Sequence, residues 1–311
     1  MPWPALPLDS WRDTRDTLQM WTQIAGKICL ALAPPVNHYW NIAFRVTSRG
    51  LLTPTLPYRD RTFTMTFDFV SHEFAIDVSD GTRETLPLRP QSVADFYAEA
   101  MAALRRAGID VHIWTMPVEV PNPIRFETDR THRSYDAEAV GRFHDVLVAI
   151  VPELESFRCE FLGKCSPVHF FWGGFDLAVT RFSGKRAPLR PDADAMTREA
   201  YSHEVISHGW WPGGGMGPTP FNDAAFYAYA VPEPAGLKTA PIGPRAAFYS
   251  LDLSEFILPY EAVRDAPDPE ADLQSFLRTT YDAAAQLAGW NRESLERHAA
   301  AAGGAFRKDS R

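Results

Sequence analysis

Histidine is the residue type in this chain that most directly suggests chemistry. Neutral imidazole serves both as a metal ligand and as a general base near neutral pH. A histidine with one hydrogen-bond partner is also a common structural residue, so neighbours and spacing have to decide between these readings. Six histidines lie beside turns, aromatic runs or carboxylates: His38, His72, His132, His169, His203 and His208.

The spacing around His203 is the most suggestive. Glu204 follows it directly and His208 lies five positions on, which differs from the i, i+4 histidine pair of helical zinc sites. Glu199 and His203 could share one helical face, but such a pair is equally well a salt bridge. Adjacent strand residues point to opposite faces, so only one of His203 and Glu204 should reach a cavity, and we expect His203 to do so.

A second set of candidates is cationic. Lys164, Arg181, Lys185 and Arg186 lie among glycines, which allow a ligand to approach backbone N–H groups closely. Such a set could bind a carboxylate or a phosphate, with Arg181 in a bidentate role. A solvated turn in which Asp176 pairs with Arg181 explains the same residues. No phosphate-loop spacing is present, so nucleotide binding is not indicated.

An aromatic, glycine-rich stretch is the third candidate. Trp210, Trp211 and Pro212 are followed by three glycines within residues 188–220, a segment without a counterpart in the first half of the chain. It could be a mobile lid, or a long loop that packs its own aromatic rings on the core. A segment present in one half alone is a sensible place to look for a site.

A repeated string predicts the architecture that holds these residues. Residues 35–40, PVNHYW, return as residues 167–172, PVHFFW, and a Gly-Lys pair precedes each copy. This indicates an internal duplication, with Trp40 and Trp172 at equivalent places. When the two Trp are aligned, His38 and His169 are one residue out of register. Strand parity then predicts that one of these histidines faces a cavity and the other packs elsewhere.

Two kinds of periodicity identify the elements. A period of 3.6 predicts helices over residues 10–24, with Gly26 as a stop, over 92–107, from 136 and from 259 to 289. Strands are predicted at 27–33, 42–46, 63–69, 74–78, 109–113, 157–162, 226–230, 248–253 and 256–258. Strands joined by tight turns with helices at the ends imply an α+β fold of mainly antiparallel sheets flanked by helices.

The order of elements is similar in both halves, and an irregular stretch rich in proline separates them. We expect an N-terminal half at 1–120, a linker at 121–135, a C-terminal half at 136–298 and a flexible tail at 299–311.

Composition narrows the class of partner. The net charge of −8 argues against a nucleic-acid partner, which would need a basic face. No run of apolar residues is long enough to cross a membrane, and the N-terminus lacks the pattern of a signal peptide. Three cysteines without zinc-like spacing indicate a reducing compartment, and we expect the cytoplasm.

Several strings together resemble a large bacterial family of unknown function. They are SPVHFFWG at 166–173, FDLA at 175–178, TRFSG at 180–184 and YSHEV at 201–205, with further matches at Gly26-Lys27, at 37–40 and at 92–97. The resemblance spans nearly the whole chain. It implies one family unit and carries no established activity.

These observations favour an enzyme that acts on a small anionic or aromatic molecule in an aromatic-lined cleft between the halves, with a divalent metal as an optional cofactor. A non-catalytic small-molecule-binding protein and a protein-interaction module are the alternatives. The predicted catalytic residues are His169, His203, Glu204 and Asp176, and His169 and His203 are the metal candidates. The predicted substrate-binding residues are Arg181, Lys164, Trp172, Trp210, Trp211 and His38.

Overall fold

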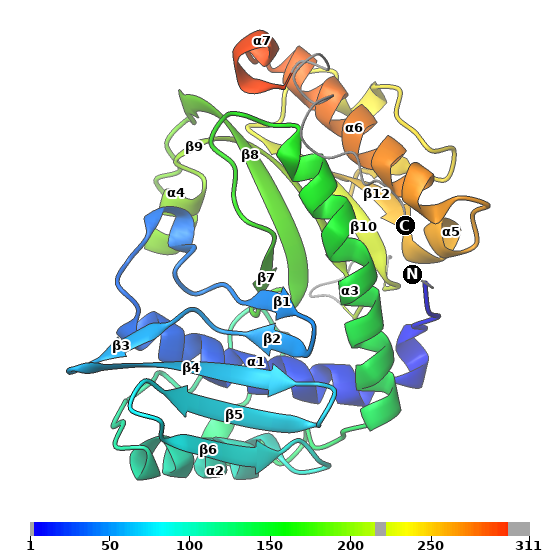
Figure 1. Ribbon diagram of the computed structural model, residues 1–311. Coiled ribbons are helices and arrows are strands. Elements are labelled where there is room, and N and C mark those ends of the chain that lie inside the picture. The colour runs from blue at the N-terminus through cyan, green and yellow to red at the C-terminus, as the bar shows by residue number, and fades with distance from the viewer. Residues whose placement is uncertain (1–2, 215–221, 298–311) are drawn as a thin grey trace, which may run out of the picture.

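Two six-stranded antiparallel sheets make up the fold in a computed structural model that describes residues 3–214 and 222–297 (Figure 1). The first sheet has the order β1-β2-β4-β5-β6, with β3 also paired to β4. Its strands are β1 (Arg45–Thr47), β2 (Gly50–Leu52), β3 (Leu56–Tyr58), β4 (Arg61–Asp68), β5 (Glu73–Val78) and β6 (Arg83–Pro87). The α+β class with antiparallel sheets is therefore confirmed.

The second sheet has the order β11-β12-β10-β9-β8-β7. Its strands are β7 (His169–Phe171), β8 (Asp176–Arg186), β9 (His203–Trp211), β10 (Ala225–Val231), β11 (Phe248–Ser250) and β12 (Glu255–Pro259). Strand β9 comes from the predicted insertion and lies in the middle of this sheet, hydrogen-bonded to β8 and β10.

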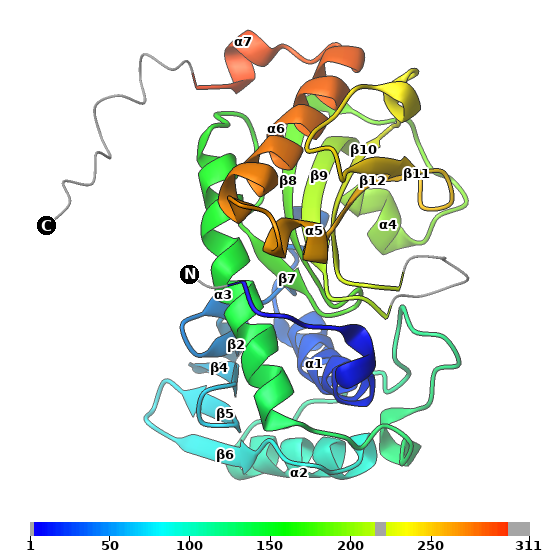
Figure 2. The ribbon, with the colours of Figure 1, turned by 90° about the vertical axis from the view of Figure 1, so that its right-hand side faces the viewer.

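Helices flank both sheets. The α-helices are α1 (Arg12–Leu32), α2 (Val93–Arg106), α3 (Ala137–Cys159), α4 (Ala195–Ala200), α5 (Tyr260–Arg264), α6 (Pro269–Leu287) and α7 (Arg292–Leu295). Helix α2 confirms its prediction, with the Ser92 hydroxyl accepting from the backbone N–H of Asp95 as the N-cap. Helices α3 and α6 cover one side of the second sheet, and α4 lies on its other side (Figure 2).

Helix α1 corrects the prediction that Gly26 ends the first helix and that a strand follows. The helix continues to Leu32, and almost all its middle residues are buried. The Trp172 indole packs against the backbone of Gly26. An added Cβ at this position would stand 2.2 Å from the ring. The glycine is required for close packing here and does not end the helix.

Two further predicted strands are wrong. Residues 157–159 are the last residues of α3, and residues 109–113 form no strand. Ile109 and Ile113 are nevertheless buried. Alternation of apolar residues therefore identified buried side chains correctly here without identifying the backbone conformation.

Strand order supports the duplication. Each half places a helix before and after an antiparallel run of five strands, β1-β2-β4-β5-β6 in one and β7-β8-β9-β10-β12 in the other. Phe44, which directly precedes β1, and Phe170 of β7 exchange backbone hydrogen bonds of 2.9 and 2.8 Å, so the first strands of the two runs are in contact. This reciprocal pair places the equivalent strands of the two halves side by side.

The predicted equivalence of Trp40 and Trp172 is wrong. Trp40 follows the 3-10 turn η2 (Asn37–Tyr39), whereas Trp172 follows strand β7. The two residues inside η2 that follow Asn37 have left-handed φ values of 59° and 58°, so no strand parity holds there. The echoed strings are similar in sequence and differ in backbone conformation.

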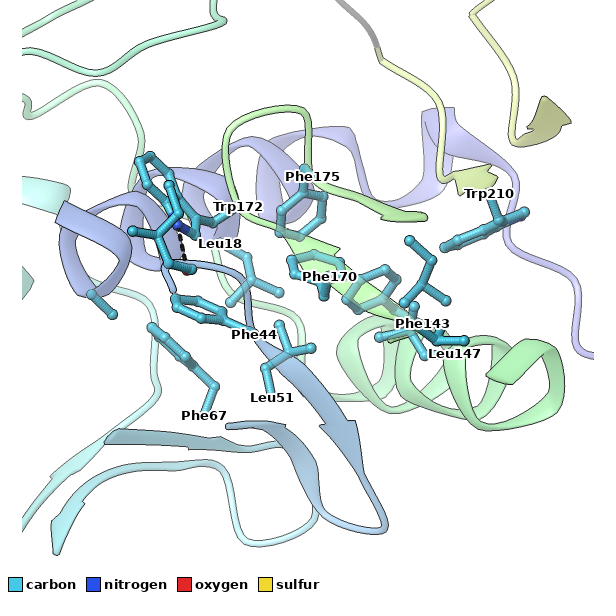
Figure 3. Close-up of a cluster of buried hydrophobic side chains, with 14 of the residues drawn as sticks. Leu18, Phe44, Leu51, Phe67, Phe143, Leu147, Phe170, Trp172, Phe175 and Trp210 are labelled. Carbon is cyan, nitrogen blue, oxygen red and sulfur yellow. Dashed lines mark hydrogen bonds between the residues drawn. The ribbon is translucent and has the colours of Figure 1, made fainter. Parts of the chain in front are cut away.

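One hydrophobic core joins the halves. Figure 3 shows Phe67, Phe44, Phe170, Phe143 and Trp210 in a nearly continuous row that passes from the first sheet to the second. All five of these side chains are buried. The domain boundaries at 121–135 remain a prediction, and the predicted tail at 299–311 lies outside the described residues.

Candidate functional site

The face of the second sheet that points away from α3 and α6 carries most of its polar side chains, and we call it the polar face. Strand alternation decides which residues it presents. Arg181, His208 and Trp210 point to the opposite side, where they contact α3 or α6. The polar face holds their neighbours in the strands, together with side chains of β7, β10 and β12: His169, Asp176, Thr180, Phe182, His203, Ser207, Tyr227, Tyr229 and Glu255.

At one end of this face, five side chains gather around the Trp40 indole, and we call the six residues the Trp40 cluster: His38, Trp40, Lys164, His169, Phe182 and His203. The Lys164 Nζ lies 5.3 Å from the centre of the Trp40 ring and 5.0 Å from that of Phe182. The His38 ring lies 5.3 Å from Trp40 and 5.9 Å from His203, and the His169 ring lies 6.1 Å from Trp40. The cluster unites residues from both halves.

His38 is fixed within this cluster by hydrogen bonds at both ring nitrogens. Its Nδ1 lies 3.2 and 3.0 Å from the backbone carbonyl oxygens of Glu199 and Ala200, so Nδ1 carries the proton. Its Nε2 accepts a 2.7 Å hydrogen bond from the Lys164 Nζ. Burial and the Lys164 charge lower the pKa of His38, which keeps the ring neutral and able to accept this bond.

The cations at this end of the polar face, Lys164 in the cluster and Arg186 opposite His203, have no acidic partner among residues 3–214 and 222–297. His203 pairs with Arg186 across strands β8 and β9, and burial, Arg186 and Lys164 lower its pKa. No carboxylate forms a salt bridge with Lys164, Arg186 or His203 in those two segments. In a chain with 39 acidic and 31 basic residues, unpaired cations at one place indicate a site for an anion.

His169 adds an unsatisfied polar atom to the cluster. The residue is 4% exposed, and no hydrogen-bond partner of its Nδ1 is found among the described residues. Burial lowers the pKa of His169 to about 4, so the ring is neutral near pH 7. A buried polar atom without a partner is destabilising, and a bound ligand would offer one.

At the other end of the polar face, Asp176 and Tyr227 form a hydrogen-bonded pair. The Tyr227 hydroxyl donates to the Asp176 Oδ2 over 2.5 Å, and to do so it crosses strand β9 at Gly209. An added Cβ at Gly209 would stand 2.2 Å from the Tyr227 ring, so only glycine leaves room. Burial, with the nearby Glu119, raises the pKa of Asp176 to about 7 despite the tyrosine.

Several residues of this end escaped the sequence analysis. Glu255 on β12 has its pKa raised to about 7 by burial and by Asp176, and burial also raises the pKa of Glu119. Tyr201 and Tyr229 share a 3.0 Å hydrogen bond, and Thr180 and Ser207 share one of 2.8 Å. The alternation of Tyr227 and Tyr229 along β10 was the available signal, since it places two phenols on one face. Nothing in the sequence showed that strands β8, β10 and β12 bring their acids and phenols together.

Four of the predicted site residues therefore lie together: His38, Lys164, His169 and His203. Asp176 shares the polar face with them. The prediction that strand parity separates His38 from His169 is wrong, because the left-handed turn at His38 brings its ring to Trp40. Of His203 and Glu204, His203 is the one on the polar face. Glu204 accepts from the Ser183 hydroxyl over 2.8 Å.

The structure does not bring Arg181 into this site. Arg181 is 1% exposed and lies against the rings of Phe157 and Tyr281, with its guanidinium donating to the Phe157 carbonyl oxygen. It points into the core because its strand neighbour Phe182 points to the polar face. A cavity shared by His169, Arg181 and His203 is therefore ruled out by strand parity.

The predicted tryptophans also have structural roles. Trp210 is fully buried against Phe143, so it neither roofs a site nor docks a partner. Trp172 packs on Gly26 and donates to the Ile42 carbonyl oxygen over 3.0 Å. Trp211 alternates with Trp210 and is half-buried on the polar face. Most of the glycine-rich stretch of the predicted lid, 215–221, lies outside the described residues.

Other features of the chain were weighed as sites. In the described part of the chain, no group of three or more His, Cys, Asp or Glu side chains is arranged to hold a metal ion. A surface hollow of about 530 Å³ lies at the start of α2 beside Arg130 and Arg133. The first helical N–H groups there already donate to the carbonyl oxygens of Asp129 and His132. No described helix is long and apolar enough to span a membrane.

Comparison with known proteins identifies the family of the chain. Residues 3–297 match the model of a family of unknown function, DUF5996, and the chain belongs to that family. No curated protein and no solved structure matches it.

Proposed function

We propose that this member of a family without a known function is an enzyme that acts on a small anionic molecule bound across the polar face of its second sheet. Lys164 and His203 would bind the anionic group. Asp176, held by Tyr227, would exchange a proton with the bound molecule. The observation that carries the proposal is the unpaired positive charge of the Trp40 cluster on the same strand face as a carboxyl group of raised pKa.

Polar groups follow one another along the polar face between Lys164 and Asp176. Lys164 lies beside Phe182, whose backbone N–H donates to the Lys164 carbonyl oxygen. Asp176 stands six residues before Phe182 on β8, which is about 20 Å along a strand. The long side chain of Lys164 shortens this gap, and the hydroxyls of Thr180 and Ser207 lie between the two ends. An anion held at one end would extend its remaining atoms toward Asp176.

Asp176 has the property that general acid–base chemistry requires. A carboxyl group with a pKa near 7 exists in both protonation states at neutral pH, so it can accept or donate a proton. Tyr227 fixes the direction of one carboxyl oxygen of Asp176 by its hydrogen bond. A chain in a reducing compartment suits the three free cysteines, and we include a cytoplasmic location in the proposal.

A second candidate is a binding protein without catalysis. The hydroxyls of Thr180, Ser207, Tyr201 and Tyr229 already bond to one another, which makes the middle of the polar face rigid and preformed. Preformed surfaces suit ligand binding as well as catalysis. The two candidates differ in the fate of the bound molecule.

The experiment is a thermal-shift screen of small carboxylates and phosphate esters, followed by product analysis of each compound that binds. We expect the wild type to be stabilised by at least one anion, and Lys164→Met to lose that stabilisation. Asp176→Asn should keep the stabilisation and lose the product. A ligand recovered unchanged from the wild type would favour the binding protein. Equal stabilisation of the wild type and Lys164→Met by every compound would refute the site.

A further inference from the structure

We infer that the anionic group recognised by the Trp40 cluster is a phosphate dianion and that a planar carboxylate binds there more weakly. This inference rests on the proposed function and names the class of its ligand. Its basis is the number, hydrogen-bonding capacity and separate origins of the donor groups in the cluster and of Arg186 beside it.

The hydrogen-bond donors, of which Lys164 and Arg186 are cations and His203 is neutral, come from three different segments. Lys164 lies in the strand-like stretch before β7, Arg186 is the last residue of β8, and His203 is the first residue of β9. Lys164 reaches the polar face because its stretch runs antiparallel to β8, with Cys165 opposite Arg181 and Ser166 opposite Thr180. Donors from three separate segments can bond to different oxygen atoms of one ligand, and a phosphate presents more oxygen atoms than a carboxylate does.

The number of unpaired positive charges also favours a phosphate dianion over a carboxylate. Lys164 and Arg186 supply two positive charges with no acid paired to them in the described chain. His203 is kept neutral by burial and by these same two charges. A dianion would neutralise both cations and would favour protonation of His203, whereas a monocarboxylate would leave one cation unpaired.

The hydrogen-bonding capacity also fits three oxygen atoms. Lys164 gives one of its three N–H groups to His38 and keeps two for a ligand. His203 holds its Nδ1 to the Ser202 hydroxyl at 3.1 Å, so its Nε2 stays available. Arg186 has no side-chain hydrogen bond to any other described residue. A phosphate offers three strong acceptor oxygens to these donors.

The test is isothermal titration calorimetry at pH 7.5 with phenyl phosphate, inorganic phosphate and benzoate. At this pH the phosphates carry close to two negative charges and benzoate carries one. We expect phenyl phosphate to bind at least about tenfold more tightly than benzoate, as one additional charge-assisted hydrogen bond typically gives. The ligand could be a phosphate ester or free phosphate, and inorganic phosphate distinguishes the two. If it binds as tightly as phenyl phosphate, the ligand is free phosphate.

The matched variants are Lys164→Met and Lys185→Met, which remove the same charge. Lys185 donates to the Gly289 carbonyl oxygen over 3.0 Å and has no contact with the Trp40 cluster. Lys164→Met should lose at least about tenfold in affinity for phenyl phosphate, and Lys185→Met should bind within about twofold of the wild type. His203→Gln is a second variant, and circular dichroism checks that each one folds.

Three results overturn the inference in distinguishable ways. If benzoate and phenyl phosphate bind equally and both depend on Lys164, the preference for phosphate is wrong and the anion site stands. If Lys164→Met and Lys185→Met weaken binding equally, the effect is one of net charge and the site is wrong. If no anion binds the wild type, the inference and the proposed function fail together.

Discussion

The side of the strand on which a residue lies decides whether its side chain reaches the candidate site. Lys164, Phe182 and His203 share the polar face, whereas Arg181 and Glu204 do not, although each of these is adjacent to one of the first group. The side chains at the candidate site are therefore set by strand alternation, and a shift of one residue in register would exchange the polar face for the apolar one.

Asp176 gives a prediction about stability and pH. Its pKa in the folded state is about 7, above the ordinary value of an unfolded carboxyl group, so the folded state binds the proton more tightly. Stability should therefore be greatest below the unfolded pKa and should fall as the pH rises toward 7. Asp176→Asn, which keeps an acceptor for Tyr227, should remove about 2 kcal/mol of that fall, a figure discounted because the carboxyl group is partly solvent-accessible.

Urea denaturation of the wild type and Asp176→Asn at pH 5 and pH 7.5 measures this difference. Glu255→Gln is a matched variant, because the pKa of Glu255 is raised to about 7 in part by Asp176. Both variants should show a smaller loss of unfolding free energy between the two pH values. An identical pH dependence in all three proteins would mean that neither carboxyl group holds its proton near neutrality.

At the scale of elements, alanine substitutions at two helical glycines distinguish the effect of helix propensity from the effect of side-chain packing. Gly26 in α1 would place a Cβ 2.2 Å from the Trp172 ring, whereas Gly141 in α3 has open space around that position. Helix propensity alone predicts that alanine stabilises either helix by about 1 kcal/mol. We expect Gly141→Ala to do so and Gly26→Ala to destabilise the fold by about 1–3 kcal/mol, because Trp172 must move. Chemical denaturation measures both, and a stabilised Gly26→Ala would show that Trp172 is not packed on α1.

Helix α2 and Gly26 show which features of the fold the sequence could predict and which it could not. Helix α2 was predictable because its cap and its apolar stripe are local signals. The role of Gly26 was not predictable, because Trp172, the residue that packs on it, is 146 positions away and no local pattern shows this contact.

The candidate site also has features that the sequence could predict and features that it could not. The histidines and Lys164 carried recognisable chemistry, and four of these predicted residues lie together around Trp40. Their meeting around Trp40 depends on a left-handed turn at His38, and the pairing of Tyr227 with Asp176 depends on a gap at Gly209. Both are tertiary features that no local pattern shows.

At the scale of the whole molecule, the two sheets are joined in a way that predicts how the protein unfolds. The backbone bonds between Phe44 and Phe170 connect the sheets, and one buried cluster contains residues of both halves. We expect a single cooperative transition, because neither half can lose its structure without exposing this shared core. Thermal or urea unfolding followed by tryptophan fluorescence and by far-UV circular dichroism should give coincident curves. Two separate transitions would mean that the halves are independent domains.

The whole molecule also explains why the site needs both halves. His38 and Trp40 come from the first half, and Lys164, His169 and His203 come from the second. The contact between η2 and α4, made through the His38 ring and the carbonyl oxygens of Glu199 and Ala200, holds these groups together. A ligand bound there would contact both halves at once.

The location of the anion site is the central claim, and histidine ring signals test it most directly. In ¹⁵N-labelled protein, long-range ¹H–¹⁵N spectra recorded during a titration with phenyl phosphate report each imidazole, with assignments from single His→Gln variants. We expect the signals of His38 and His203 to shift, with His203 moving toward its protonated form, while those of His72 and His132 stay unchanged. Shifts confined to His72 or His132, or no shift at saturating ligand, would contradict an anion site at the Trp40 cluster.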